Sequence, residues 1–439
     1  MAIITGDSGN NTLNNLLEND TIEGGGGSDT AVYNGSAADY QISFINGIWT
    51  IMDTNQADGN DGLDTLRNIE QLQFADRTYN LVPSTGETQV NTTTTNEQQG
   101  AKIAVLTDGG WVVTWHSQAQ DGSGWGVYGQ RYDSTGMAIG DEFRINTTTA
   151  NNQSTPAVAA LVDGGFLVAW NSDGNQDGSN NGIYAQRYDV TGAAVGSEFL
   201  VNTYTNDHQA NPSVTGLANG GFVLTWQSAW QDGSYNGVYG QIYNAAGAKV
   251  GGEFRPHTNT SYEQQNSKVT ALSSGGFLVS WQDSEQDSSS WGVYGRLYDA
   301  SGTAIGTNEF CINTTTSDQQ GDVSIAALGT GFVAVWNSIN QDGSTWGIYG
   351  QRYNGSGDKL GTEFRINSQV YDSQYIPSVT NLNGGGFVVT WQGYSQDGSG
   401  WGIYSQRFND SGNKVGTEFR VNTYTTSEQI SSSETSISR

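Results

Sequence analysis

The sequence predicts an all-β protein whose larger part is a six-bladed β-propeller, and two observations predict it. A segment of about 55 residues occurs six times in the 439-residue chain. Each copy carries four short apolar or alternating runs separated by glycine-rich turns, and no window shows a helical period. A fixed period with four strands per repeat is typical of propeller blades, whereas the coils of a β-solenoid are much shorter.

The repeat is clearest in its second copy, where residues 164–170 are followed by the polar loop 176–179 and by residues 182–188. The tryptophans that end the first of these segments are spaced by 55, 56, 55, 55 and 55 residues: Trp115, Trp170, Trp226, Trp281, Trp336 and Trp391. This spacing predicts the same strand order in every repeat. We expect these tryptophans to lie in the core.

Four strands are predicted in the second copy, at residues 157–161, 166–170, 183–188 and 198–201. The second strand is apolar on both faces, so it must be covered on both sides. The third alternates, with Tyr184 and Tyr188 on one face and Arg187 on the other. We therefore expect each blade to run from buried inner strands to a more solvent-exposed outer edge.

Each predicted fourth strand belongs to a recurring segment, the fourth-strand phrase, which ends in Asn-Thr in most copies. The array contains one more copy of this phrase than six blades need, because it occurs at residues 89–92 and again at 418–423. We predict that 418–423 complete the sixth blade, and that 89–92 lie along an exposed blade edge or add to a neighbouring molecule. A seven-bladed ring is the alternative. The predicted domains are 1–85, a small β module, 86–425, the propeller, and 426–439, a polar tail or the start of a seventh repeat.

Composition limits the partners. The net charge of −27 and the pI near 4.1 disfavour nucleic acid and anionic membranes, and they suit cations. No run approaches 18 apolar residues, so no membrane span is expected. The single cysteine, Cys311, allows no internal disulfide, and the first residues lack the basic and apolar regions of a cleavable secretory signal.

Residues 6–32 divide into three nonapeptides, and the third, Gly-Gly-Gly-Gly-Ser-Asp-Thr-Ala-Val, fits the pattern G-G-x-G-x-D-x-U-x. In this the chain resembles the secreted repeats-in-toxin (RTX, haemolysin-type calcium-binding) proteins. Residues 64–76, Asp-Thr-Leu-Arg-Asn-Ile-Glu-Gln-Leu-Gln-Phe-Ala-Asp, look like the module that accompanies such nonapeptides in that family.

The resemblance implies a calcium-binding parallel β-roll in a protein that acts outside the cell, exported without a cleavable signal peptide. Carried over by position, the implied Ca²⁺ ligands are Asp29 and Asp20, with Asn11 as a third. A further cation could be held by Asp58, Asp61 and Asp64, although a solvated turn is an equally good interpretation.

The polar loop Gln-Asp-Gly-Ser recurs in the repeats, with Ser288 in place of glycine in the fourth, and supplies one aspartate each time: Asp121, Asp177, Asp232, Asp287, Asp342 and Asp397. One interpretation is a calcium loop in each blade. The other is that the aspartate accepts backbone N–H bonds and fixes the turn, and we favour it because a single carboxylate is a poor calcium site.

Aromatic residues recur in the same loops as Trp125, Trp291, Trp346 and Trp401, and two blades have Asn181 and Asn236 instead. An aromatic ring in a polar loop can stack on a sugar or can cover the next blade, and the second interpretation is slightly favoured.

No catalytic motif is evident, because His116, His208 and His257 occupy unrelated repeat positions and no repeat has an insertion. The sequence thus predicts a non-enzymatic, secreted, calcium-binding propeller that binds extracellular glycan or matrix as an adhesion module. Two alternatives remain open. One is a structural subunit of a surface layer or filament that self-associates by strand addition, and the other is a polysaccharide-active enzyme.

Overall fold

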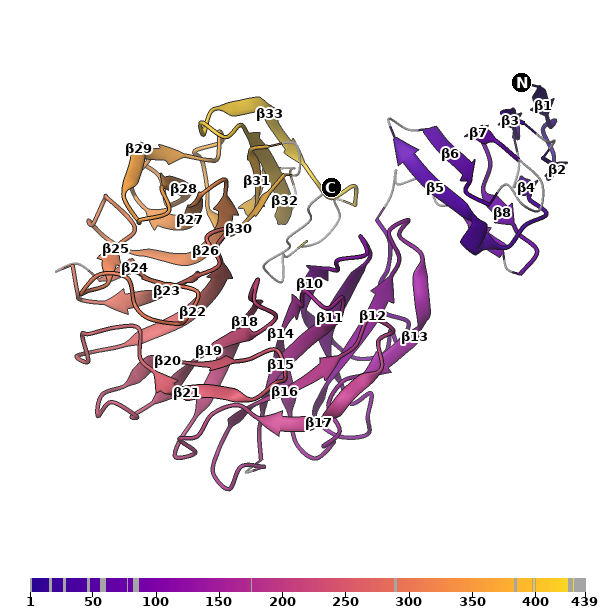
Figure 1. The fold of residues 1–439 in the computed structure, drawn as a ribbon. Coiled ribbons are helices and arrows are strands. Elements are labelled where there is room, and N and C mark those ends of the chain that lie inside the picture. The colour runs from indigo at the N-terminus through magenta and orange to yellow at the C-terminus, as the bar shows by residue number, and fades with distance from the viewer. Residues whose placement is uncertain are drawn as a thin grey trace. The chain divides into compact units, whose positions relative to one another are not determined.

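The computed structural model describes residues 2–15, 18–26, 29–45, 48–55, 61–76, 78–81, 87–174, 176–287, 290–382, 385–396, 398, 400–424 and 429. The chain forms two compact units, one built mainly from Met1–Thr88 and the other mainly from Gln89 onward (Figure 1). Among the described residues the only helix is a short 3-10 turn, Ala37–Asp39, and no helix could cross a bilayer.

The first unit contains two sheets. One has the order β1-β3-β7-β6-β5 and the other the order β2-β4-β8-β9. The strands are β1 (Ile3–Thr5), β2 (Thr12–Asn14), β3 (Thr21–Glu23), β4 (Thr30–Val32), β5 (Tyr40–Ile45), β6 (Ile48–Asp53), β7 (Leu63–Arg67), β8 (Gln71–Gln73) and β9 (Thr78–Asn80).

The nonapeptides form a parallel β-roll, as the sequence predicts. Strand β1 pairs with β3 and β2 with β4, each 18 residues apart, so two nonapeptides make one turn of the roll. Strands β7 and β8 add the next rung to the two sheets, so residues 64–76 continue the roll. The apolar position of each nonapeptide points inward, and Ile22 and Ala31 are fully buried.

The second unit consists of six four-stranded antiparallel blades, each ordered as in the sequence. The blades are β10 (Gln98–Val105), β11 (Trp111–Gln118), β12 (Trp125–Tyr132), β13 (Ala138–Arg144); β14 (Gln153–Ala160), β15 (Phe166–Ser172), β16 (Gly182–Tyr188), β17 (Ala194–Leu200); β18 (Gln209–Gly216), β19 (Phe222–Ala229), β20 (Asn236–Tyr243), β21 (Lys249–Phe254); β22 (Gln264–Ala271), β23 (Phe277–Ser284), β24 (Trp291–Tyr298), β25 (Phe310–Cys311); β26 (Gln320–Leu328), β27 (Gly331–Ile339), β28 (Trp346–Tyr353), β29 (Lys359–Arg365); and β30 (Gln374–Asn381), β31 (Phe387–Tyr394), β32 (Trp401–Phe408), β33 (Lys414–Arg420). They follow one another around a common axis (Figure 1).

The six first strands face this axis. One cavity is lined by residues from all of them: Ile103, Val158, Val214, Val269, Ile325 and Val379. The six-bladed propeller predicted from the sequence is therefore confirmed, with these strands around a central channel. Burial falls outward as expected, because every residue of β15 is buried whereas the first four residues of β17 are exposed.

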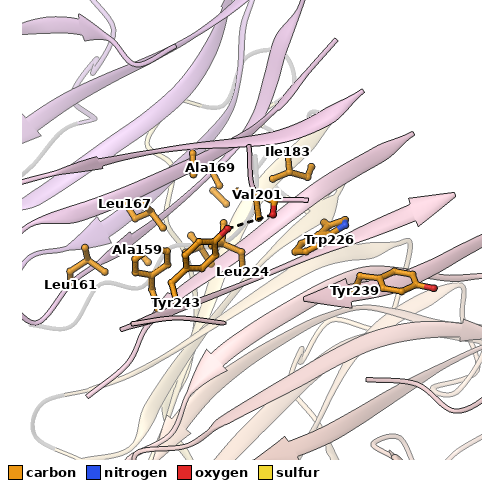
Figure 2. Packing of buried hydrophobic residues seen from close by; sticks show 14 residues of the cluster. Ala159, Leu161, Leu167, Ala169, Ile183, Val201, Leu224, Trp226, Tyr239 and Tyr243 are labelled. Atoms are coloured by element: carbon orange, nitrogen blue, oxygen red, sulfur yellow. Dashed lines mark hydrogen bonds between the residues drawn. The ribbon is translucent and has the colours of Figure 1, made fainter. Parts of the chain in front are cut away.

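Neighbouring blades share an apolar core. Between the second and third blades, Leu167, Ala169 and Val201 contact Trp226 and Tyr243 of the next blade (Figure 2). The same arrangement recurs at four further junctions. The tryptophans Trp170, Trp226, Trp281, Trp336 and Trp391 are fully buried, and burying each stabilises the fold by about 3 kcal/mol.

The first and last copies of the fourth-strand phrase are both in contact with a blade. Strand β33 completes the sixth blade, as expected. Thr92 donates from its N–H to Glu142 of the first blade at 2.8 Å, and Thr147 makes the same contact with Glu198 of the second. Residues 90–92 thus contact the first blade of their own chain, Gln89 and Thr92 are exposed, and addition of this segment to a neighbouring molecule stays a prediction.

Candidate functional site

The loop aspartates fix turns. The side-chain oxygen of Asp177 accepts the N–H of Ser179 at 3.1 Å. The same contact, at 3.1 to 3.2 Å, is made by Asp121, Asp232 and Asp342. An Asx turn uses one carboxylate oxygen, whereas the other oxygen of each of these four aspartates is buried without a hydrogen-bond partner. Asp397 lies outside the described residues, and calcium binding at these loops stays a prediction.

Two further invariant residues connect each loop to the end of the preceding blade. The amide of Gln176 donates to Glu198 at 2.8 Å, and the N–H of Thr147 donates to the other oxygen of Glu198 at 2.6 Å. In every blade, the equivalent glutamate is hydrogen-bonded to the preceding fourth-strand phrase. We call the edge of the propeller that carries these loops, and the starts of the first strands, the loop face.

Near the start of each first strand the repeats differ from one another. A bulge interrupts the pairing with the second strand, and its central residue has a left-handed backbone with φ between +49° and +66°. The six residues are Gly100, Thr155, Asn211, Asn266, Asp322 and Ile376. Only glycine adopts this conformation freely, so the five other residues carry backbone strain of about 1 kcal/mol or more each.

These six positions form the channel mouth, at the loop-face end of the channel. A cavity there is lined by Thr155, Asn211 and Asn266, together with Lys102 and Lys268. The side chains are held by amides of the second strands. Asn211 donates to Gln227 at 3.0 Å and Asn266 donates to Gln282 at 2.6 Å. The mouth is therefore a set of oriented polar groups at the end of a channel that both apolar and polar side chains line.

Asp322 is the carboxylate among the six positions. Its oxygen accepts a hydrogen bond from Asn337 at 2.8 Å. Burial raises the pKa of Asp322 above its usual range, and the Asn337 bond and the nearby Lys268 oppose this rise. In the first blade, His116 occupies the place of the second-strand amides, and burial lowers its pKa to about 4, so the ring is neutral at pH 7. An acid with a raised pKa and a neutral imidazole are the groups that acid–base chemistry uses.

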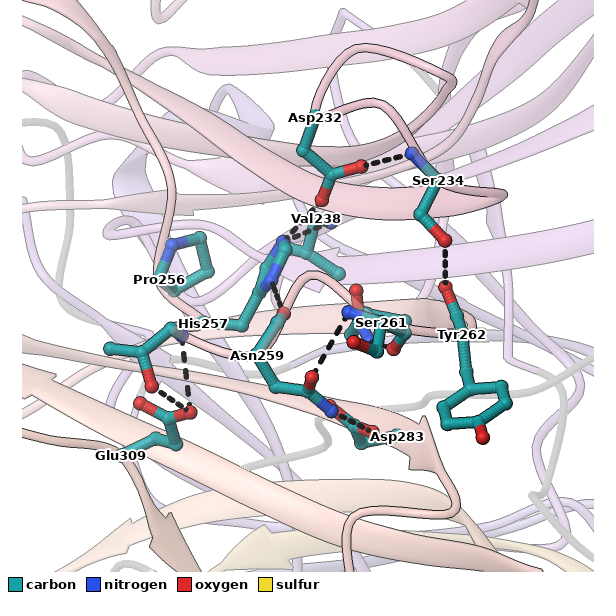
Figure 3. Close-up of polar contacts among 12 residues, drawn as sticks. Asp232, Ser234, Val238, Pro256, His257, Asn259, Ser261, Tyr262, Asp283 and Glu309 are labelled. Atoms are coloured by element: carbon teal, nitrogen blue, oxygen red, sulfur yellow. Dashed lines mark hydrogen bonds and ion pairs between the residues drawn. The ribbon is translucent and has the colours of Figure 1, made fainter.

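A second departure from the repeat lies between the third and fourth blades (Figure 3). His257 stands where the other blades have Asn, and Asp283 stands where they have Ser or Gly. His257 accepts the N–H of Val238 at 3.0 Å through Nε2, and its Nδ1 lies 2.6 Å from the Asn259 carbonyl, so it is neutral. Burial lowers the pKa of His257 and raises the pKa of Asp283 to about 7.

This cluster does not form a second active site. His257 is 1% exposed and Asp283 is fully buried, so a substrate has no access to either. His257 reproduces the hydrogen bond that Asn202 makes to the N–H of Ile183 in the preceding repeat. The cluster is thus a variation of the buried interior, and its effect on the free energy of unfolding depends on pH.

The four loop tryptophans begin third strands and are partly buried. Trp346 of the fifth blade and Trp401 of the sixth both contact Tyr375, at ring-centroid distances of 5.3 and 5.6 Å. Trp401 also contacts Tyr394 at 5.0 Å. Trp125 contacts His116 at 4.8 Å, whereas no ring contact is found for Trp291 among the described residues.

In the first unit, the predicted calcium ligands form two columns. In one, Asp64 accepts the N–H of Asp20 at 2.7 Å, and Asp20 accepts the N–H of Ala2. In the other, Asp29 accepts the N–H of Asn11 at 2.7 Å, and Glu70, which sequence reasoning missed, accepts the N–H of Asp29 at 2.7 Å. The carboxylates therefore join successive rungs of the roll.

The remaining predicted ligands are separate from these columns. Asp61 accepts the hydroxyl of Tyr40, and Asp58 lies outside the described residues. The part of the chain that the structure describes brings no three His, Cys, Asp or Glu side chains together as a metal cage. One oxygen each of Asp20 and Asp29 is nevertheless buried without a hydrogen-bond partner, as a cation ligand would be.

The fold and site define a β-propeller with a polar channel mouth and an aromatic loop face. No family model and no curated protein matches the chain. It is similar to a solved protein of unknown function from Dyadobacter fermentans, with 11% identity and a TM-score of 0.50 over 69% of this chain and 92% of that chain. At this identity the similarity shows the fold alone.

Other similar structures are enzymes. An α-L-arabinofuranosidase of Fusarium graminearum in complex with arabinobiose is 13% identical, with a TM-score of 0.47 over 70% of this chain and 91% of that chain. A Hadza microbial sialidase is 9% identical, with a TM-score of 0.47 over 85% and 73% of the two chains.

The prediction that the protein is not an enzyme is contradicted by these comparisons, because the similar structures are mostly glycoside hydrolases. The prediction depended on the absence of an insertion in any repeat. In this architecture, single substitutions at the strand bulges are enough to gather different side chains at the channel mouth, so equal repeat lengths say little about catalysis.

Proposed function

We propose that this protein is a polysaccharide-active propeller, which binds a glycan on its loop face and cleaves it at the channel mouth. The observation that carries the proposal is Asp322, a half-buried carboxyl at a strained bulge position that five other blades fill with uncharged residues. A scaffold role would be repeated in each blade, whereas the acid that protonates a leaving oxygen is needed only once in a site.

The role assigned to Asp322 is that of general acid. Hydrolysis of a glycosidic bond requires attack of water on the sugar and protonation of the leaving oxygen, and a raised pKa favours the protonated form of a carboxyl. Asn337, which donates to Asp322 at 2.8 Å, holds the carboxyl in one orientation. The amides of Asn211 and Asn266 are suited to sugar hydroxyls, because each amide both donates and accepts hydrogen bonds.

The test is cleavage of neutral polysaccharides, with arabinan among them because similar structures bind arabinose oligosaccharides. New reducing ends would be measured for the native protein and for Asp322→Asn. We expect the substitution to lower the rate by 10²-fold or more, as loss of a general acid does. Asp283→Asn is the matched control, because it removes a buried carboxyl far from solvent and should leave the rate unchanged. Absence of cleavage across the panel, or full activity of Asp322→Asn, would overturn the proposal.

We also propose that the protein acts outside the cell and that calcium orders its first unit. The RTX resemblance and the two unpartnered oxygens of Asp20 and Asp29 support this. With few carboxylates available, backbone carbonyls would supply many of the ligands, as calcium accepts.

Calcium removal should therefore loosen the first unit alone. We expect a chelator to increase proteolysis between Gly6 and Tyr79 and to leave the propeller fragment intact, with Asp29→Ala reproducing the effect in calcium. Mass spectrometry of the fragments would locate the cuts. Equal resistance with and without chelator would show that the roll needs no metal.

A further inference from the structure

The exposed aromatic residues of the propeller are concentrated on the loop face. The Trp and Tyr side chains of the described propeller residues that are exposed, by 42% to 73%, are Trp230, Tyr235, Tyr262, Tyr371, Tyr394 and Tyr424. All six lie in the second-to-third-strand loops, at the end of a second strand, or in the connections between blades. On the opposite edge the large exposed side chains in the turns are the aliphatic Val162 and Val190.

Four rings of the fifth and sixth blades make a continuous row, which we call the aromatic row: Trp346, Tyr375, Trp401 and Tyr394. Successive centroids are 5.3, 5.6 and 5.0 Å apart, and the ring planes meet at 40°, 63° and 61°. Tyr394 and Trp401 are cross-strand partners in β31 and β32, while Tyr375 comes from β30. The row therefore spans a blade junction and is held by regular strands.

The scaffold does not require this row. The second and third blades have Asn181 and Asn236 at the tryptophan position, and both fold like the others. Trp291 has the tryptophan without an aromatic neighbour among the described residues. Tyr375 stands where the other blades have Gln, Ser, Ala or Gly. Because blades form without such a row, we infer that the row serves binding.

The chemistry of the row suits a neutral sugar chain. Each sugar ring has a face of C–H groups that can pack on an aromatic ring, and the contacts within the row hold its rings in place while Tyr394 is exposed to solvent. The net charge of −27 would repel uronate or sulfated polymers. Tyr375 directly precedes the bulge residue Ile376, so the row passes beside the channel mouth.

We propose that the aromatic row is a holding site for a neutral polysaccharide, separate from the groups that cleave it. This rests on the proposed function only in taking the same polymer as the substrate. The row provides affinity for the chain, and the channel mouth provides the chemistry.

The experiment is electrophoresis in native gels that contain each neutral polysaccharide of the panel. Trp401→Ala should lose retardation, with a dissociation constant at least fivefold larger. Tyr394→Ser should also reduce the retardation. Trp291→Ala is the matched control at the same repeat position and should migrate like the native protein. Asp322→Asn should retain full retardation, which separates holding from cleavage.

The outcomes are separable. If Trp401→Ala and Tyr394→Ser are retarded as strongly as Trp291→Ala, or if the native protein is retarded by no polymer, the row does not hold glycan and the proposal is overturned. If Trp401→Ala lowers the melting temperature, Tyr394→Ser decides, because its ring is exposed. Loss of retardation in these variants without any polymer cleavage would support the aromatic row and overturn the proposed enzyme.

Discussion

The Gln-Asp-Gly-Ser loops and the first-strand bulges lie on the same face of the propeller and follow opposite rules. The loops are nearly invariant: their aspartates accept N–H groups of the turn, and their glutamines donate to the glutamate of the fourth strand. The bulges keep the same strained backbone but carry five residue types in six blades. The difference teaches that, within a chain of internal repeats, invariance marks the scaffold, and function is to be sought where a conserved backbone carries varied side chains.

A residue that differs from its equivalents in the other repeats need not be functional, and Asp283 at the junction of the third and fourth blades is an example. Its substitution gives the largest expected change in stability. Asp283 is fully buried and its pKa is raised to about 7. The stability associated with this carboxyl is fully present below its pKa in the unfolded state, near 4, and is lost as the pH rises through its pKa in the folded state, about 7. Asp283→Ser, the residue of four other blades, should therefore stabilise the protein above pH 7, by at most about 4 kcal/mol.

This effect can be measured by urea unfolding at pH 5 and pH 8. The gain in midpoint over the native protein should be larger at pH 8 than at pH 5, and the rate of polysaccharide cleavage should not change. A constant difference between the two pH values would show that Asp283 does not titrate in this range.

The loop aspartates should contribute less, and only to stability. Asp177→Ala removes the hydrogen bond to the N–H of Ser179, so we expect a loss of about 1 to 2 kcal/mol. Thermal unfolding with and without calcium checks this. A destabilisation that appears only in calcium would instead support the calcium-loop interpretation of these residues.

The smallest effect is expected at the bulges, and its sign is opposite. Ile376 is β-branched and has φ of 50°, a conformation that glycine adopts without strain, as Gly100 does in the first blade. Ile376→Gly should therefore stabilise the propeller by up to about 1 kcal/mol, although glycine also gains entropy in the unfolded state. A clear destabilisation in differential scanning calorimetry would indicate that the Ile376 side chain, and not the strain, dominates at this position.

The sequence by itself determined the architecture, because the same pattern of strand, turn and core residues occurs six times. The apolar second strand, the turn glycines and the Trp170-type residues predict one blade, and the period predicts six of them. The nonapeptide pattern similarly predicted the roll, since its inward apolar positions recur every nine residues, as Ile22 and Ala31 show.

Tertiary structure alone decided which residues meet. Gly100, Thr155, Asn211, Asn266, Asp322 and Ile376 lie about 55 residues apart and are unlike one another, so no motif groups them. They converge because six first strands surround one axis with the same bulge. In the same way, Tyr375 joins Trp346 and Trp401 only across a blade junction. Local patterns set how each blade folds, whereas the packing of blades around the axis brings distant side chains into one site.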